Sequence, residues 1–216
     1  MLNAPIEIVR DALAESFLPR NHYVTPYTLT AVQGGGRTVL FDASTGGQLV
    51  PTGGQATANL RAAGINPARV DLVVLTHVHG DYITSLTTAD GQAVFPNAEV
   101  VVPIAEWRYW SDAGNEVLTP ARQKPNFANL ARCLAPYADR VRRVEKGQEA
   151  APGIRAVTTP GHTPGRWLGC VGRGRRASPR HPRPWRRVRR ARVWSKSAPG
   201  TAAWLRRSCQ WQAAPP

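Results

Sequence analysis

The stretch "LTHVHGDY", residues 75–82, begins at the last residue of the short apolar run "LVVL", residues 72–75, which predicts a buried strand. Its His77, His79 and Asp81 stand at alternating positions. Residues two apart on an extended segment point to the same side, so these side chains can face one site at the end of the strand. Two imidazoles and a carboxylate suit zinc or a similar divalent ion. The stretch therefore predicts a metal site.

A third histidine stands in a matching context near residue 160. The segment "TTPGHTPG", residues 158–165, places His162 in a loop framed by Pro and Gly, directly after the predicted strand "GIRAVTT". Such a loop is rigid and is suited to presenting one ligand. A single histidine is more often an ordinary surface or core residue, but three ligand types followed by His162 favour a metal centre.

These motifs resemble those of the metallo-β-lactamase superfamily of metal-dependent hydrolases, whose signature is H-x-H-x-D-H followed by a later His. The matching segments are "THVHGD" and "TPGHTPG". Their surroundings agree, because "GGRTVLFDASTGG" is similar to the second hairpin strand and loop of that family. "FPNAEVVVPIAEW" is similar to a segment of its lactonase-like and organophosphate-hydrolase-like branches. The resemblance covers roughly residues 20 to 165.

The resemblance implies an α/β fold, an αββα sandwich that is incomplete at the C-terminus of this chain. It implies that His77, His79 and His162 bind one metal, that Asp81 binds a second, and that a metal-bound hydroxide carries out hydrolysis. By family analogy the substrate is a small molecule: an ester, a lactone or a phosphotriester.

Two departures from the family pattern predict one Zn²⁺ per chain instead of two, and impaired activity. Tyr82 stands where the signature has its last His, and a neutral phenol is a poorer ligand than imidazole. The family continues with further strands, a bridging Asp and a last His, whereas residues 166–216 contain no Asp. With no second metal to bind, Asp81 is expected to act in catalysis, by orienting or deprotonating the attacking water.

The whole chain is 42% hydrophobic, a globular composition, and its pattern up to residue 165 predicts one α/β domain. An amphipathic helix over residues 5–18 is expected to pack on another element, and a Gly-rich hairpin is expected around Gly34 to Gly36. Trp107, Tyr109 and Trp110 either wall the substrate pocket or, more commonly for such clusters, belong to the core. The further expected elements are helices at 55–64, 104–110 and 126–138 and strands at 71–76, 98–103 and 153–159.

The net charge of +14 comes entirely from residues 166–216, which contain no acidic residue. A segment so rich in Arg and Pro is predicted to be disordered, giving a truncated metallo-β-lactamase-like domain at 1–165 and a basic tail at 166–216. One interpretation is a polybasic arm that binds nucleic acid non-specifically, through Arg on phosphates and Trp on bases. The other is translation out of frame, which would replace the last third of the domain and leave an impaired or inactive remnant.

Three cysteines without a CxxC pair indicate neither a disulfide framework nor a structural zinc cage. The sequence has no apolar run long enough to span a membrane. We therefore expect a cytoplasmic protein with no membrane association. The sequence does not indicate an oligomeric state.

Overall fold

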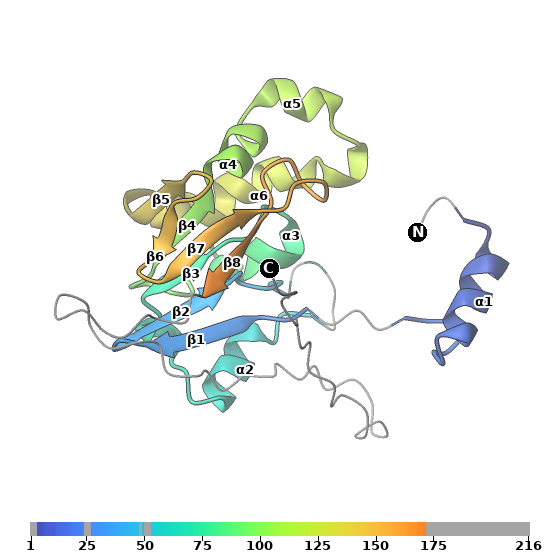
Figure 1. The fold of residues 1–216 in the computed structure, drawn as a ribbon, viewed down its shortest axis with the longest axis horizontal. Coiled ribbons are helices and arrows are strands. Elements are labelled where there is room, and N and C mark those ends of the chain that lie inside the picture. The colour runs from blue at the N-terminus through green and yellow to red at the C-terminus, as the bar shows by residue number, and fades with distance from the viewer. Residues whose placement is uncertain (1–3, 24–26, 48, 50–52, 172–216) are drawn as a thin grey trace, which may run out of the picture.

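The computed structural model describes residues 4–23, 27–47, 49 and 53–171, and two β-sheets form its centre (Figure 1). The first sheet has five strands in the order in which they occur along the chain. β1 and β2 form an antiparallel hairpin, and β2 to β5 run parallel. The strands are β1 (Thr30–Gly34), β2 (Arg37–Phe41), β3 (Leu72–Val74), β4 (Glu99–Pro103) and β5 (Val141–Val144).

The second sheet is antiparallel and packs face to face on the first. It consists of β6 (Glu149–Ala151), β7 (Ile154–Thr158) and β8 (Trp167–Val171). One apolar cluster joins the two sheets, and it takes its members from both of them. Its members are Val32, Val39, Leu72, Val74, Val101, Val144, Ala150, Ala151, Ile154, Ala156 and Trp167.

Helices cover the other face of the first sheet. A second apolar cluster there joins the sheet to α2, α3, α4 and α6. The helices of this layer and its surroundings are α2 (Ala56–Ala62), α3 (Gly80–Ile83), α4 (Ile104–Trp110), α5 (Ala113–Leu118) and α6 (Pro125–Leu134). Short 3-10 turns lie at Pro67–Arg69, Thr84–Leu86, Ala121–Gln123 and Ala135–Arg140.

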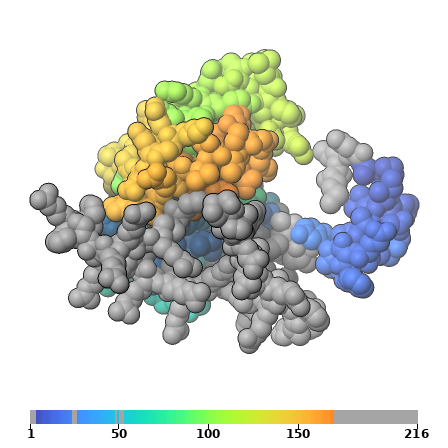
Figure 2. Space-filling model, viewed as in Figure 1, coloured from blue at the N-terminus to red at the C-terminus, as the bar shows by residue number. Residues whose placement is uncertain are grey.

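Helix, sheet and sheet are three of the four layers of the predicted αββα sandwich. On the outer face of the second sheet, Val157 and Leu168 stand opposite each other in register and are 43% and 46% exposed. Within the described residues, no helix contributes to the cluster between the sheets or covers this outer face. In Figure 2 the gold and orange residues of this sheet face the viewer.

The boundary predicted after residue 165 falls too early, because β8 continues the fold to Val171. Trp167, only 2% exposed, belongs to the cluster between the sheets. Gly169 lies so close to the Phe41 ring that any side chain there would collide with it. The apolar character of "WLGCV" was masked at the sequence level by the Arg-rich residues that follow it. The rest of the predicted basic tail, 172–216, lies outside the described residues.

The helix predicted at 5–18 forms as α1 (Ile6–Glu15), but the expectation that it packs on another element is wrong. None of its residues is buried, and Ile6 and Ile8 are 61% and 59% exposed. Figure 1 shows α1 apart from the two sheets. The spacing of its apolar residues thus predicted the helix correctly, but the prediction that this helix is packed against another element was incorrect.

The other predicted elements are confirmed with small shifts of their ends. The Gly-rich hairpin turns at Gly35 and Gly36, whose φ of 58° and 79° suit the tight turns of twisted hairpins. Strands β5 and β6 and helices α3 and α5 were not predicted. In the described part of the chain, no helix is long and apolar enough to cross a membrane.

Candidate metal centre

His77, His79 and His162 converge at one end of the first sheet. His77 and His79 follow β3, and His162 lies in the loop that joins β7 to β8. Each imidazole offers one nitrogen, and the three nitrogens all lie within 4.8 Å of one another. Two segments far apart in the sequence therefore bring together the three histidines expected to bind one metal.

His77 is the most deeply placed of the three, at 2% exposure. Its Nδ1 lies 2.9 Å from the hydroxyl of Thr76, and Asp42 in turn accepts hydrogen bonds from the Thr76 amide (2.7 Å) and hydroxyl. This contact fixes the ring and leaves Nε2 buried without a hydrogen-bond partner. Burial, with smaller contributions from His79, His162 and Arg166, lowers the pKa of His77 to about 3, so the ring is neutral at pH 7.

His79 and His162 meet edge to face, with His79 Nδ1 3.1 Å from His162 Nε2. Two nitrogens on one tetrahedral zinc ion, each about 2.0–2.1 Å from it, are about 3.3 Å apart. The observed separation is close to that value. Burial, followed by the charge of His162, lowers the pKa of His79, so this imidazole also favours the neutral form that binds metal.

The three histidines fit a metal ion on independent grounds. His77 Nε2 is buried and has no hydrogen-bond partner. A buried polar atom without a partner is costly, and a coordinated cation would satisfy it. Neutral imidazole is also the commonest protein ligand for zinc and related ions.

Asp81 and Tyr82 lie beside the three histidines, in the first turn of α3. The Asp81 carboxylate is not part of the group whose ligand atoms converge. Its negative charge partly offsets the lowering of the His79 pKa, so it lies within electrostatic reach of that ring. The Tyr82 ring packs on His77 with 4.2 Å between ring centroids. Burial raises the pKa of Tyr82, which keeps its phenol protonated at neutral pH.

A buried acid, Asp42, and a cation, Arg166, lie near the histidines at this end of the sheet. Burial raises the pKa of Asp42 to about 7, against the lowering effects of its Thr76 hydrogen bonds and of Arg166. Arg166 follows the His162 loop, and its Nε is buried without a partner. Its positive charge lowers the pKa values of Asp42, His77 and Tyr82, so it lies within electrostatic reach of all three.

Sequence reasoning missed Glu106 and Asn126, which hold the metal-site loops from the helical layer. Glu106, on α4, is fully buried and accepts hydrogen bonds from the amides of Val78 (2.9 Å) and Gly165 (2.6 Å). Asn126, on α6, accepts one from the Gly80 amide at 3.0 Å. Glu106 stands four residues before Trp110, on the same helix face, and an acid on a buried face is the signal that indicates such a role.

The aromatic cluster belongs mainly to the core. Trp110 is 2% exposed, packs against Phe127 and donates its indole N–H to Glu106. It also reaches His79 edge-on, with 5.8 Å between ring centroids. Tyr109 contacts Trp110 and shares a hydrogen bond with Thr119. Trp110 thus forms part of the floor beneath His79.

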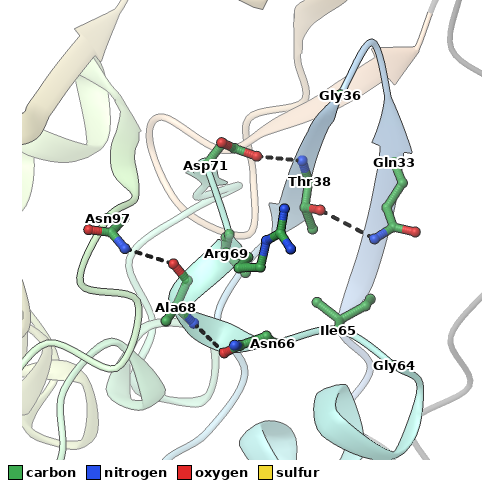
Figure 3. Close-up of a pocket in the computed structure, with 11 residues that line it drawn as sticks. Gln33, Gly36, Thr38, Gly64, Ile65, Asn66, Ala68, Arg69, Asp71 and Asn97 are labelled. Carbon is green, nitrogen blue, oxygen red and sulfur yellow. Dashed lines mark hydrogen bonds between the residues drawn. The ribbon is translucent and has the colours of Figure 1, made fainter.

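A separate cleft of about 660 Å³ lies at the opposite end of the first sheet, near the start of β3 (Figure 3). Several of its polar groups bond to one another: Asp71 accepts from the Thr38 amide, and Asn97 donates to the Ala68 carbonyl. Ligands of open α/β sheets bind at the carboxyl ends of the strands, where the histidines are. This cleft is therefore not the candidate site.

Two packed sheets, a helical layer and three convergent imidazoles at the strand ends define an α/β sandwich with a candidate metal site. The model of the Metallo-beta-lactamase superfamily matches residues 23–177, and the chain belongs to that superfamily. No curated protein matches the sequence.

Solved structures agree with this assignment. The hydrolase AbOPH, described as in the beta lactamase superfamily, is 26% identical with a TM-score of 0.65, over 77% of this chain and 59% of that one. A probable metal-dependent hydrolase from Staphylococcus aureus is 25% identical with a TM-score of 0.54, over 65% and 51%. AidC, a dizinc quorum-quenching lactonase, is 19% identical with a TM-score of 0.66, over 79% and 60%, and shows likeness of fold alone. The chain thus spans about three fifths of the length of AbOPH and AidC.

Proposed function

We propose that this chain is a metal-dependent hydrolase of small esters, lactones or phosphotriesters, working with one zinc ion held by His77, His79 and His162. The observation that carries the proposal is the convergence of the three imidazole nitrogens within 4.8 Å, with the Nε2 of His77 buried and without a partner. Three protein ligands that leave a position open for water are the arrangement of catalytic zinc sites.

Each histidine has a distinct part in this proposal. His77 is held by Thr76 and is neutral, so it can bind a metal without first losing a proton. His79 is half-buried above Trp110, while His162 is exposed and leaves one side of the centre open to substrate. When bound, zinc supplies the Lewis acidity that activates water near neutral pH.

Asp81 is proposed as the residue that orients the attacking water and takes its proton. It follows His79 by two residues and acts electrostatically on that ring, yet it stands outside the convergent group. A carboxylate close to a metal centre but free of it is available as a general base.

The choice of one metal over two rests on Tyr82 and on the residues after Gly165. The Tyr82 phenol stays protonated and its ring packs on His77, so it offers a weak ligand where the family signature has an imidazole. Residues 166–216 contain no Asp to bridge two metals. The nearby positive charge of Arg166 also disfavours a second cation.

The substrate class is proposed by family analogy and from the likeness to AbOPH, a hydrolase 26% identical to this chain. All three substrates present an electrophilic carbon or phosphorus with an oxygen leaving group, which suits attack by activated water. The fold itself does not choose among them.

Zinc titration and elemental analysis of the purified chain test the proposal, together with assays of a lactone, an aryl ester and a phosphotriester. We expect one tightly bound zinc per chain and zinc-dependent turnover, both lost in His162→Ala. His22→Ala is the matched control, because His22 is an exposed histidine outside the site. Two tightly held metals, no zinc binding, or equal losses in both variants would overturn the proposal.

A further inference from the structure

The buried carboxylate of Glu106 contacts both metal-site loops at once. Glu106 is 0% exposed, and its two oxygens accept three N–H hydrogen bonds. Oε2 accepts from the Val78 amide and from the Trp110 indole, both at 2.9 Å, and Oε1 accepts from the Gly165 amide at 2.6 Å.

Two of these three donors lie in the segments that carry the histidines. Val78 stands between His77 and His79, and Gly165 is at the end of the loop that carries His162. One carboxylate group therefore ties the end of β3 to the β7–β8 loop, although the two segments are far apart in the sequence.

The close packing of Gly165 against α4 is a second, independent sign that the His162 loop is held by this helix. A Cβ at Gly165 would collide with the backbone nitrogen of Glu106 and lie 2.8 Å from the Ala105 carbonyl carbon and Cβ. The His162 loop thus rests directly on the first turn of α4, and only glycine allows that approach.

We propose that Glu106 is a positioning residue that locks the two loops together, so that the three imidazole nitrogens converge before any metal binds. This role concerns the metal centre of the proposed function and rests on it for its catalytic meaning. A carboxylate suits the task because it is an acceptor only, and ionised acceptors form the stronger hydrogen bonds. The lock itself is a property of the metal-free protein.

Glu106→Gln is the test variant, because it keeps the size of the side chain and turns one acceptor oxygen into an N–H donor. That donor must then face an amide or indole N–H, so one loop loses its partner. Glu145→Gln makes the same chemical change at an exposed position and is the matched control. Trp110→Phe removes the one donor that belongs to neither loop.

Amide hydrogen exchange of the metal-free protein tests the lock directly. Glu106→Gln should accelerate exchange at Val78 or Gly165 by about tenfold or more, while Glu145→Gln and Trp110→Phe should leave both amides unchanged. Unchanged exchange in Glu106→Gln, or equal acceleration at every core amide, would overturn the inference. This readout needs neither metal nor activity.

Metal binding gives the second readout. Zinc affinity should fall about 10- to 100-fold in Glu106→Gln, as is usual for partners that hold metal ligands, and the visible spectrum of the cobalt-substituted protein should change. If the unaltered chain binds zinc and Glu106→Gln binds it equally well, the inference fails and the proposed function stands. If the unaltered chain binds no zinc, the proposed function fails, and amide exchange alone decides the inference.

Gly165→Ala keeps the inference testable if Glu106→Gln does not fold. The added Cβ should displace the His162 loop from α4 and accelerate exchange at residues 159–166, while Val78 stays protected by its own bond to Glu106. Protection of both segments in Gly165→Ala would contradict the lock.

Discussion

The indole nitrogen of Trp167 donates a hydrogen bond to the carbonyl oxygen of Leu75 across 2.5 Å. The Trp167 amide also donates to the Thr76 carbonyl at 3.1 Å. These two bonds join β8, at the edge of the second sheet, to the end of β3, one residue before His77. The strand that begins the predicted tail therefore supports the metal centre.

Trp167→Ala should destabilise the protein by about 3–5 kcal/mol, because it removes a large side chain that is 2% exposed in the cluster between the sheets. Urea denaturation of the metal-free protein measures the free energy of unfolding. Leu168→Ala, at a neighbouring position that is 46% exposed, is the control and should cost less than about 1 kcal/mol. Equal losses in the two variants would show that β8 does not belong to the core.

The metal centre could be predicted from sequence to the extent that its residues sit in local motifs. "THVHGD" lies at the end of an apolar run, and "PGHTPG" follows an alternating strand, so each segment carries its own signal. The structure brings His77, His79 and His162 together as expected. What local patterns could not supply were the residues that hold the histidine-bearing loops: Glu106 and Asn126 reach the backbone amides of those loops only through the packing of α4 and α6.

The end of the domain was misplaced for a compositional reason. "WLGCV" alternates an inward Trp167 with an outward Leu168, but five residues are a weak signal beside the long Arg-rich stretch that follows. The surroundings of α1 were misjudged because apolar spacing predicts an amphipathic helix and does not identify what it packs against. Strand β5, "VRRV", was not predicted because the two arginines at its centre interrupt the apolar pattern of a strand.

Tyr82→Phe should leave zinc affinity within about threefold of the unaltered chain, because the phenol hydroxyl is a poor ligand when protonated. The phenyl ring keeps the packing on His77 that the tyrosine makes at 4.2 Å. Competition with a zinc chelator measures the affinity. A fall of more than about tenfold would identify the Tyr82 hydroxyl as a ligand, in place of the purely packing role that we assign.

Asp81→Asn should lower kcat by about 10²- to 10⁴-fold while zinc affinity stays nearly constant, because we assign Asp81 to proton transfer and not to the metal. Asp139→Asn is the control, since Asp139 is an exposed acid that is remote from the histidines in sequence and pairs with Arg140. Steady-state kinetics and zinc titration are both needed. Loss of zinc in Asp81→Asn would instead make this carboxylate a metal ligand.

Asp42→Asn should change how the stability of the metal-free protein depends on pH. Burial raises the pKa of Asp42 from 3.8 to about 7, so between these values the folded state keeps a proton that the unfolded state has lost. Its contribution to stability is therefore complete below about pH 4 and is lost as the pH rises to 7. Of the charged groups near Asp42, Arg166 opposes this shift and Asp81 adds to it.

His77 acts in the opposite direction, because burial lowers its pKa from 6.5 to about 3 and its contribution is lost as the pH falls. In the unaltered chain these effects partly cancel, whereas Asp42→Asn leaves the effect of His77, to which His79 adds because its pKa is also lowered. Asn also tolerates the φ of 62° found at this position. Urea denaturation in a chelator at pH 4.5 to 7.5 should show the variant gaining about 3 kcal/mol relative to the unaltered chain as the pH rises. Parallel pH profiles for the two proteins would mean that Asp42 is ionised throughout this range.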